Sequence, residues 1–172
     1  KMYVDGMLHA LKFDSQEDPK LVHRLDKDTS GILVIARNRA GSHRMQKWLM
    51  DKEIGLKKCY WCFVEGKPKP SSGRIKNFVE KVSTKAFGEK VYVQPEKTEG
   101  SKIAITEYKI IESIGESVSW LAMYPVTGRL HQLRVHCATT LNTPILGDEK
   151  YGNGLPDSLR PMFKDERLGT EE

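Results

Sequence analysis

Two short segments of the chain gather side chains that can move protons or hold negative charge. The first, residues 22–31, reads Val-His-Arg-Leu-Asp-Lys-Asp-Thr-Ser-Gly and contains the carboxylate of Asp26 two positions after the cation of Arg24. The second, residues 124–136, reads Tyr-Pro-Val-Thr-Gly-Arg-Leu-His-Gln-Leu-Arg-Val-His. A carboxylate can act as a nucleophile or a general base, and a nearby guanidinium favours its ionised form. The two segments therefore predict acid–base or nucleophilic chemistry.

The elements expected to hold the first segment are a strand and a helix. Residues 31–36 are continuously apolar, which predicts a buried strand directly after the polar turn. Ser42 is expected to cap a helix, because Met45, Trp48 and Leu49 follow at helical spacing. A shorter helical pattern occupies residues 7–11, before a polar loop.

The second half of the chain is dominated by strand patterns. Strands are predicted over 58–66, 103–111 and 118–124, and the last two are expected to form a hairpin. Residues 80–102 are charged and interrupted by glycine, so they predict an irregular hairpin or a mobile insertion. A helix is expected from Thr127 onward. Many strands with few helices predict an α+β fold with a mixed, mainly antiparallel sheet and flanking helices.

Composition sets the broad class of the protein. The chain has 172 residues, 38% of them hydrophobic, which suits one domain with a substantial core. We expect this domain to span residues 1–152 and a loosely ordered tail to follow over 153–172. No apolar run approaches the roughly 20 residues of a membrane-spanning helix, so no membrane partner is expected.

Charge and cysteine content bear on partners and compartment. Lys and Arg outnumber Asp and Glu by 28 to 23, a surplus compatible with RNA binding and equally with a solvated, lysine-rich surface. The three cysteines form no disulfide framework, which favours a reducing compartment. Cys59 and Cys62 are expected on opposite faces of a strand, so packing in the core explains the cysteines better than a metal or redox role.

The two segments resemble motifs of the RluA family of pseudouridine synthases, enzymes that isomerise uridine in ribosomal and transfer RNA. The matching segments follow one another in family order. They are His23–Asp26 with 29–31, Lys58 with Tyr60, 104–108, 125–129, 131–136, and 144–148 with 151–152.

The chain departs from the family pattern at two places. The family's strand with a Lys-Pro-x-Gly loop is missing before the first segment, and a strand with an L-H-A motif is missing after residues 148–151. An S4-type RNA-binding domain is also missing. We therefore expect the catalytic heart of such an enzyme, with one or both sheet edges cut away.

The resemblance implies three catalytic residues, Asp26, Tyr60 and Arg134. Asp26 either attacks C1′ of the ribose or removes a proton from C2′, and the sequence leaves both routes open. Arg134 is implied to pair with this carboxylate and to keep it charged. Tyr60 is implied to stack on the extruded base and to help remove the proton from C5.

The same resemblance implies a set of RNA-binding residues around the catalytic groups. They are His23, Arg24, Lys58, Arg129, His131 and Gln132. Arg24 would reach into the RNA where the uridine has left, with an ordinary phosphate contact as the alternative. Arg129, His131 and Gln132 would line the cleft, either touching RNA or supporting Arg134. The reaction demands no cofactor or metal, and the dispersed histidines do not have the spacing of metal ligands.

We therefore predict a pseudouridine synthase that acts on structured RNA, with large-subunit rRNA the first candidate and tRNA the second. A ribosomal subunit precursor is a further candidate partner, and we expect a monomer in the mitochondrial matrix or the bacterial cytoplasm. One alternative is a catalytically dispensable fold that binds rRNA as a ribosome assembly factor. A remote alternative is a magnesium-dependent phosphohydrolase, because residues 25–29, with Asp26 and Asp28 followed by Thr29, are close to a D-x-D-x-T pattern.

Overall fold

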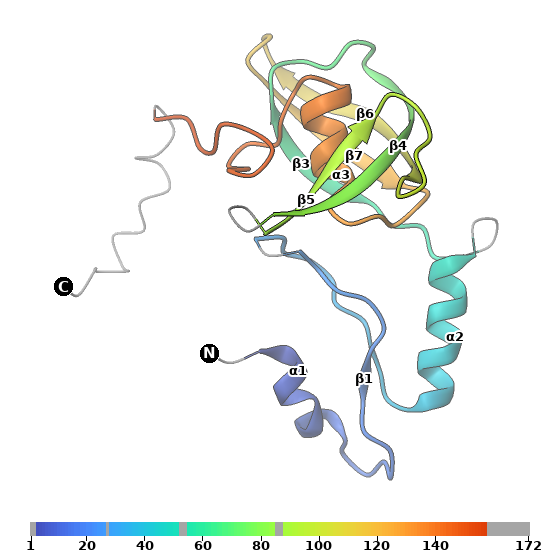
Figure 1. Ribbon diagram of the computed structural model, residues 1–172. Helices are drawn as coiled ribbons and strands as arrows, with labels where there is room; N and C mark the ends of the chain where they lie inside the picture. The colour runs from blue at the N-terminus through green and yellow to red at the C-terminus, as the bar shows by residue number, and fades with distance from the viewer. Residues whose placement is uncertain (1–2, 27, 52–54, 85–87, 158–172) are drawn as a thin grey trace. The chain divides into compact units, whose positions relative to one another are not determined.

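The computed structural model of the protein contains two compact units, Lys1–Lys57 and Lys58–Glu172, and each has its own architecture. The structure describes residues 3–26, 28–51, 55–84 and 88–157 (Figure 1). Within these ranges no helix is long and apolar enough to cross a membrane. The separate units do not test the expected domain over 1–152, which stays a prediction. Most of the expected tail, residues 158–172, lies outside the described ranges.

The first unit consists of short elements joined by long loops (Figure 1). They are helix α1 (Val4–Met7), 3₁₀-helix η1 (Leu8–Leu11), strands β1 (Lys20–Leu21) and β2 (Ile35–Ala36), and helix α2 (Arg39–Met50). The two strands pair antiparallel, with Lys20 opposite Ala36. The short helical pattern at the start of the chain is confirmed by α1 and η1.

The buried strand predicted over 31–36 forms only at its last two residues. Ile32 is 85% exposed, so the prediction was wrong for this part of the run. Two features explain the difference. The partner strand β1 has only two residues with which to pair. Gly31 also has a φ of 140°, a backbone conformation that does not continue a regular strand.

Helix α2 begins earlier than the sequence predicts, because Asn38 and not Ser42 is its N-cap. The Asn38 side chain accepts a hydrogen bond from the backbone N–H of Gly41 at 2.7 Å. Glu17 accepts a second one from the N–H of Arg39 at 2.6 Å. Both contacts satisfy donors that the first helical turn leaves unpaired. Ser42 is buried within the first turn.

The second unit is a five-stranded sheet in the order β3-β7-β6-β4-β5, with every pair antiparallel. Its strands are β3 (Tyr60–Glu65), β4 (Ser72–Thr84), β5 (Gly88–Gln94), β6 (Lys102–Ile114) and β7 (Val118–Pro125). Helix α3 (Gln132–Val135) continues into π-helix η2 (His136–Thr140). The predicted α+β fold with a mainly antiparallel sheet is confirmed, as are the 58–66 strand and the hairpin of β6 and β7.

Residues 80–102 were predicted to form an irregular hairpin or a mobile insertion. The antiparallel pair is present but regular, because β4 and β5 pair in continuous register from Phe78 opposite Gln94 to Thr84 opposite Gly88. Val79 and Val91 are buried, while charged residues alternate with them. One cross-strand contact joins Lys81 and Glu89. Buried and charged residues therefore alternate as in a strand with one buried face. The many charged residues made this two-residue period hard to recognise in the sequence.

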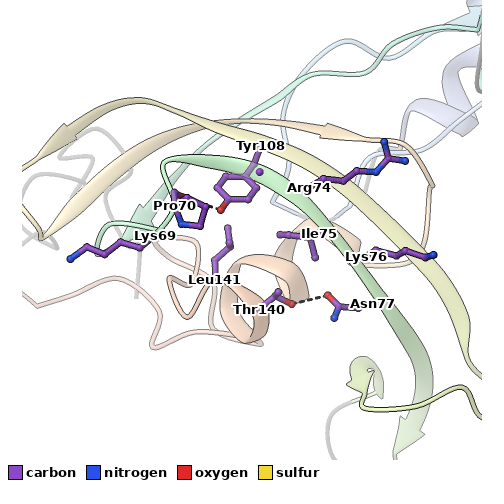
Figure 2. A pocket seen from close by; sticks show the side chains of 10 residues that line it. Lys69, Pro70, Arg74, Ile75, Lys76, Asn77, Tyr108, Thr140 and Leu141 are labelled. Atoms are coloured by element: carbon purple, nitrogen blue, oxygen red, sulfur yellow. Dashed lines mark hydrogen bonds between the residues drawn. The ribbon is translucent and has the colours of Figure 1, made fainter.

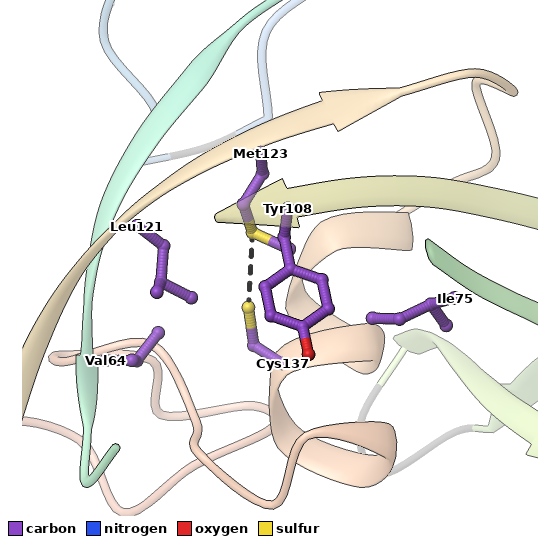
Figure 3. Packing of buried hydrophobic residues seen from close by; sticks show 6 residues of the cluster. All are labelled: Val64, Ile75, Tyr108, Leu121, Met123 and Cys137. Carbon is purple, nitrogen blue, oxygen red and sulfur yellow. Dashed lines mark hydrogen bonds between the residues drawn. The ribbon is translucent and has the colours of Figure 1, made fainter. Parts of the chain in front are cut away.

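The core lies between the sheet and the helix formed by α3 and η2 (Figure 3). Its central cluster consists of residues from four strands and the helix: Val64, Ile75, Tyr108, Leu121, Met123 and Cys137. The Cys137 sulfur lies 3.4 Å from the Met123 sulfur. The ring of Tyr108 covers Gly73, where a Cβ atom would come within 3.2 Å of the ring. A side chain at position 73 would therefore require the Tyr108 ring to shift by a few tenths of an ångström.

The three cysteines are free. Cys62 and Cys137 both contact Met123, which confirms the expected packing role for these two. The expectation was wrong for Cys59, which is exposed just before β3. Its thiol instead makes a hydrogen bond that raises the pKa of Tyr124.

Truncation of the central core residue gives a test of this packing. Leu121 is fully buried, so Leu121→Ala should lower the free energy of unfolding by about 3 kcal/mol through lost burial and a residual cavity. Ile114→Ala removes side-chain atoms from an exposed position of the same sheet and should change it by less than about 0.5 kcal/mol. Urea unfolding followed by tryptophan fluorescence measures both. Equal losses for the two variants would contradict the assigned core.

Candidate active site

In the first unit, Asp26 sits in a loop that is closed by hydrogen bonds. The N–H of Thr29 donates to the Asp26 carbonyl at 3.1 Å, which makes a tight turn. The N–H of Val34 donates to Nε2 of His23 at 2.9 Å and joins the two sides of the loop. The geometry therefore gives His23 a part in shaping the loop, while Arg24 is exposed.

In the second unit, Gln132 is 3% exposed and its amide makes four hydrogen bonds inside the protein. Its oxygen accepts from the hydroxyl of Thr127 at 2.7 Å and the N–H of Arg129 at 3.0 Å. Its nitrogen donates to the carbonyl of Ile105 and the hydroxyl of Thr106, each at 2.9 Å. Of the two predicted roles, contact with RNA and support of the site, this arrangement favours support.

The hydroxyl of Thr106 extends this network to a buried histidine. It lies 2.8 Å from Nδ1 of His136, whose side chain has no exposed surface. Thr106 accepts from Gln132, so its own proton is available to His136 Nδ1, whereas His136 Nε2 is buried without a hydrogen-bond partner among the described residues. Burial lowers the pKa of His136 to about 4, so the ring is neutral at physiological pH.

Arg134 forms a bidentate ion pair with Asp148. Nε lies 2.7 Å from Oδ2 and Nη2 lies 2.6 Å from Oδ1, and the Asp148 side chain is 4% exposed. Oδ1 also accepts from the backbone N–H groups of Lys150 and Tyr151, at 2.9 and 3.0 Å. Burial acts to raise the pKa of Asp148, but these hydrogen bonds and the charge of Arg134 together hold it below its usual value.

Tyr151 packs beside this ion pair, with its ring centre 5.1 Å from Cζ of Arg134. Its hydroxyl accepts from the N–H of Val91 at 2.7 Å and lies 2.9 Å from Nδ1 of His131. Burial raises the pKa of Tyr151 to about 12, so the phenol stays protonated. We call Arg134, Asp148, Tyr151 and His131 the Arg134 cluster.

Tyr60 and Lys58 lie at the start of β3. Tyr60 pairs opposite Met123 and is half-buried, on the face of the sheet that α3 and η2 cover. The Lys58 ammonium is near the loop before α3, since it lies 3.7 Å from where a Cβ would stand on Gly128. The exposed Arg129 follows in that loop and donates through Nε to the carbonyl of Ile103 at 3.0 Å.

The predicted site residues thus fall into two groups. The sheet unit holds six of them: Lys58, Tyr60, Arg129, His131, Gln132 and Arg134. The loop unit holds the other three, His23, Arg24 and Asp26. The implied pair of Arg134 and Asp26 therefore stays a prediction. Sequence reasoning missed Asp148 and Tyr151 as site residues, although an acid and an aromatic residue in the 147–152 block were an available signal.

A separate cavity of about 360 Å³ lies between the start of β4 and the end of η2 (Figure 2). Inside it Tyr108 donates to the carbonyl of Pro70 at 3.0 Å, and Thr140 donates to Asn77 at 2.9 Å. None of the predicted site residues lines it. Among the described residues, no group of three or more His, Cys, Asp or Glu side chains could hold a metal ion.

Comparison with known proteins places this geometry in a family. Residues 7–139 match the family of RNA pseudouridylate synthases. RNA pseudouridine synthase 4, mitochondrial, from Arabidopsis thaliana is 38% identical over 95% of this chain and 37% of its own length. Ribosomal large subunit pseudouridine synthase C from Rickettsia conorii is 39% identical over 87% of this chain and 47% of its own length. The chain thus spans less than half of these two relatives.

A solved structure agrees with the sequence relatives. The human RNA pseudouridylate synthase domain containing 4 protein superposes with a TM-score of 0.75 and 26% identity. The superposition covers 94% of this chain and 67% of the human chain. The match therefore includes most of the residues on which the site depends.

The four hydrogen bonds of Gln132 lead to a stability prediction. Gln132→Leu keeps the approximate size but leaves buried donors and acceptors unpaired, so it should lower the free energy of unfolding by about 2–4 kcal/mol. Gln94→Leu is the matched control, because Gln94 is half-buried and its amide donates one bond, to Glu80 at 3.1 Å. Chemical denaturation compares the two, and a smaller loss for Gln132→Leu would contradict the network.

The neutral, buried His136 makes stability depend on pH. Its pKa is about 4 in the folded protein and 6.5 for an unperturbed histidine, so the unfolded chain binds more protons between these limits. Stability should therefore fall as the pH drops, by about 2 kcal/mol between pH 7.5 and 5 for this group.

The contribution of His136 is isolated by comparing variants. His136→Asn keeps an atom near the position of Nδ1 but cannot titrate, so its unfolding free energy should lack this part of the pH dependence. His43→Gln, at an exposed position of α2, should retain it. Urea unfolding at several pH values gives the slopes, and equal slopes for wild type and His136→Asn would refute the assignment.

Proposed function

Because this chain belongs to the RNA pseudouridylate synthase family, we propose that it isomerises uridine to pseudouridine in structured RNA. The reaction breaks the bond between N1 and C1′, turns the detached uracil and rejoins it through C5, which then loses its proton. The observation that supports this function best is the extent of the family match. It includes both the Asp26 segment and the Arg134 segment, whereas the phosphohydrolase alternative leaves the second segment unexplained.

In this proposal Asp26 is the group that reacts with the sugar. It attacks C1′ to give a covalent intermediate, or it removes the C2′ proton to give a glycal. Either role needs the ionised carboxylate, and a guanidinium within about 4–6 Å favours that form. Arg134 is the proposed partner. Asp148 takes up Nε and Nη2 of its guanidinium, so Nη1 is the nitrogen that points away from that pair.

Tyr60 is proposed to receive the uracil after it leaves the RNA stack. A flipped base loses its stacking neighbours, and an aromatic ring supplies a replacement surface. The position of Tyr60 supports this role, because it is half-buried at the first residue of β3. Lys58 precedes it by two residues in the chain. We further propose that the phenol helps to remove the C5 proton.

RNA contacts are proposed for the exposed and half-buried polar residues around these groups. Arg24 and Arg129 are exposed, and Lys58 and His131 are half-buried. The net charge of +5 is consistent with binding to a polyanion. His23 and Gln132, proposed from the resemblance as further contacts, act in this scheme by holding the loops that present the others.

Large-subunit rRNA is the proposed substrate, and tRNA is the second candidate. The names of two relatives support this choice and the proposed compartments. One is a ribosomal large subunit pseudouridine synthase from a bacterium, and another is a mitochondrial RNA pseudouridine synthase from a plant. We accordingly propose a monomer that works in the mitochondrial matrix or the bacterial cytoplasm, without a cofactor.

The proposal is tested by removing the charge of Asp26. Asp26→Asn should lower the single-turnover rate of pseudouridine formation by about a thousandfold or more, because the nucleophile or base is lost. RNA affinity should change by less than about threefold, because phosphate contacts supply most of the binding. Tritium release from [5-³H]uridine in unmodified large-subunit rRNA and tRNA transcripts measures the rate, and filter binding measures the affinity.

A neighbouring carboxylate provides the control. Asp28→Asn removes the same charge two residues away, at a positive φ of 67° that asparagine tolerates, and should keep most of the activity. Pseudouridine formed by Asp26→Asn at the wild-type rate would overturn the proposed mechanism. A wild-type chain that binds rRNA but forms no pseudouridine would favour the assembly-factor alternative.

A further inference from the structure

We propose that Asp148 and Tyr151 are positioning residues that fix the Arg134 guanidinium and tie its orientation to the β4–β5 hairpin. This inference rests on the proposed function of Arg134 as the partner of the reacting carboxylate. It assigns to two residues outside the predicted site a part in arranging the catalytic group. Three sets of contacts in the sheet unit support it.

The first set fixes the guanidinium in its plane. Asp148 binds it side-on through two nitrogen atoms, at 2.6 and 2.7 Å, which determines both its position and its rotation. The carboxylate is itself held by the backbone N–H groups of Lys150 and Tyr151. The backbone of the 148–151 loop thus fixes the orientation of the long, flexible Arg134 side chain.

The second set supports the guanidinium through an aromatic ring. The ring centre of Tyr151 lies 5.1 Å from Cζ of Arg134, within the range of a cation–π contact. The ring cannot turn freely, because its hydroxyl bonds to the N–H of Val91 and lies 2.9 Å from His131 Nδ1. Asp148 and Tyr151 therefore restrain the guanidinium together.

The third set connects the cluster to strand β5. Three consecutive residues of that strand contact Lys150 or Tyr151. The Lys150 ammonium donates to the Glu89 carbonyl at 2.8 Å, Lys90 Nζ lies 5.3 Å from the centre of the Tyr151 ring, and the Val91 N–H donates to the hydroxyl. A displacement of the hairpin thus changes the contacts that orient Arg134.

A purely structural role for Asp148 makes a different prediction. An anchor for the loop needs only an oxygen that accepts from the two backbone N–H groups, and asparagine retains that oxygen. Positioning needs both carboxylate oxygens on the guanidinium, and asparagine cannot supply them. Loss of the Asp148 charge would, by Coulomb's law alone, leave Arg134 a stronger partner for another carboxylate. A fall in rate for Asp148→Asn therefore reports orientation and not charge.

The experiment measures single-turnover pseudouridine formation by the full chain on saturating [5-³H]uridine rRNA transcript. Asp148→Asn should lower the rate by about 10- to 100-fold, the size expected for a misplaced catalytic group, with RNA affinity within about threefold of wild type. Tyr151→Phe keeps the ring but frees it from Val91 and should lower the rate by a smaller factor. Glu149→Gln, at an exposed position of the same loop, should leave it unchanged.

A double-mutant cycle with Arg134→Lys separates positioning from general damage. If Asp148 acts through Arg134, Asp148→Asn should slow the Arg134→Lys enzyme by less than about twofold. If the rate losses of the two single variants multiply in the double variant, the inference is overturned. A wild-type rate for Asp148→Asn would overturn it as well. If Asp148→Asn does not fold, the same cycle is measured with Tyr151→Phe and judged by the same two outcomes.

The proposed function fails in a distinguishable way. A wild-type chain that forms no pseudouridine, or an active Asp26→Asn variant, overturns that function and this inference with it. The positioning roles alone are overturned by a different set of results. In that case the wild type is active, Asp26→Asn is inactive, and the rate losses of Asp148→Asn and Arg134→Lys multiply in the double variant.

Discussion

The helix formed by α3 and η2 lies against the sheet because its buried polar groups find partners on β6. Thr106, at the centre of that strand, receives a hydrogen bond from Gln132 and meets His136, so two side chains of the helix share one hydroxyl. An apolar residue at position 106 would remove one of the four hydrogen bonds of Gln132 and the partner of His136 Nδ1, and an unmet hydrogen bond in the core is costly. His131 and Arg134 stand on the same helical segment, so the placement of the site follows from this polar contact.

The parts of the fold that could be predicted are those in which burial alternates visibly along the chain. β6 shows this period over its first half, β7 is instead apolar with three consecutive buried residues, and the pairing of the two strands was expected. The β4–β5 hairpin has the same period, but charged residues around Val79 and Val91 hid it. The apolar run over 31–36 predicted a longer strand than the structure contains. Hydrophobicity alone does not supply a pairing partner, and β1 offers only two residues.

The candidate site divides in a similar way. Asp26, Tyr60 and Arg134 could be proposed as site residues because their residue types and spacing match a family pattern. Asp148 and Tyr151 lay in a matching segment but were not proposed as site residues, since their contacts with the Arg134 side chain exist only after the chain has folded. Gln132 shows the converse case, because the resemblance implied either RNA contact or support of Arg134, and its burial and four internal hydrogen bonds favour support.

The ion pair of Arg134 and Asp148 also has an electrostatic consequence at long range. Its two opposite charges cancel at a distance, so Arg134 adds little to the field that draws a polyanion toward the protein. Attraction must come from cations such as Arg129, which lie outside this pair. The number of counterions displaced on RNA binding would accordingly reflect those exposed cations more than Arg134.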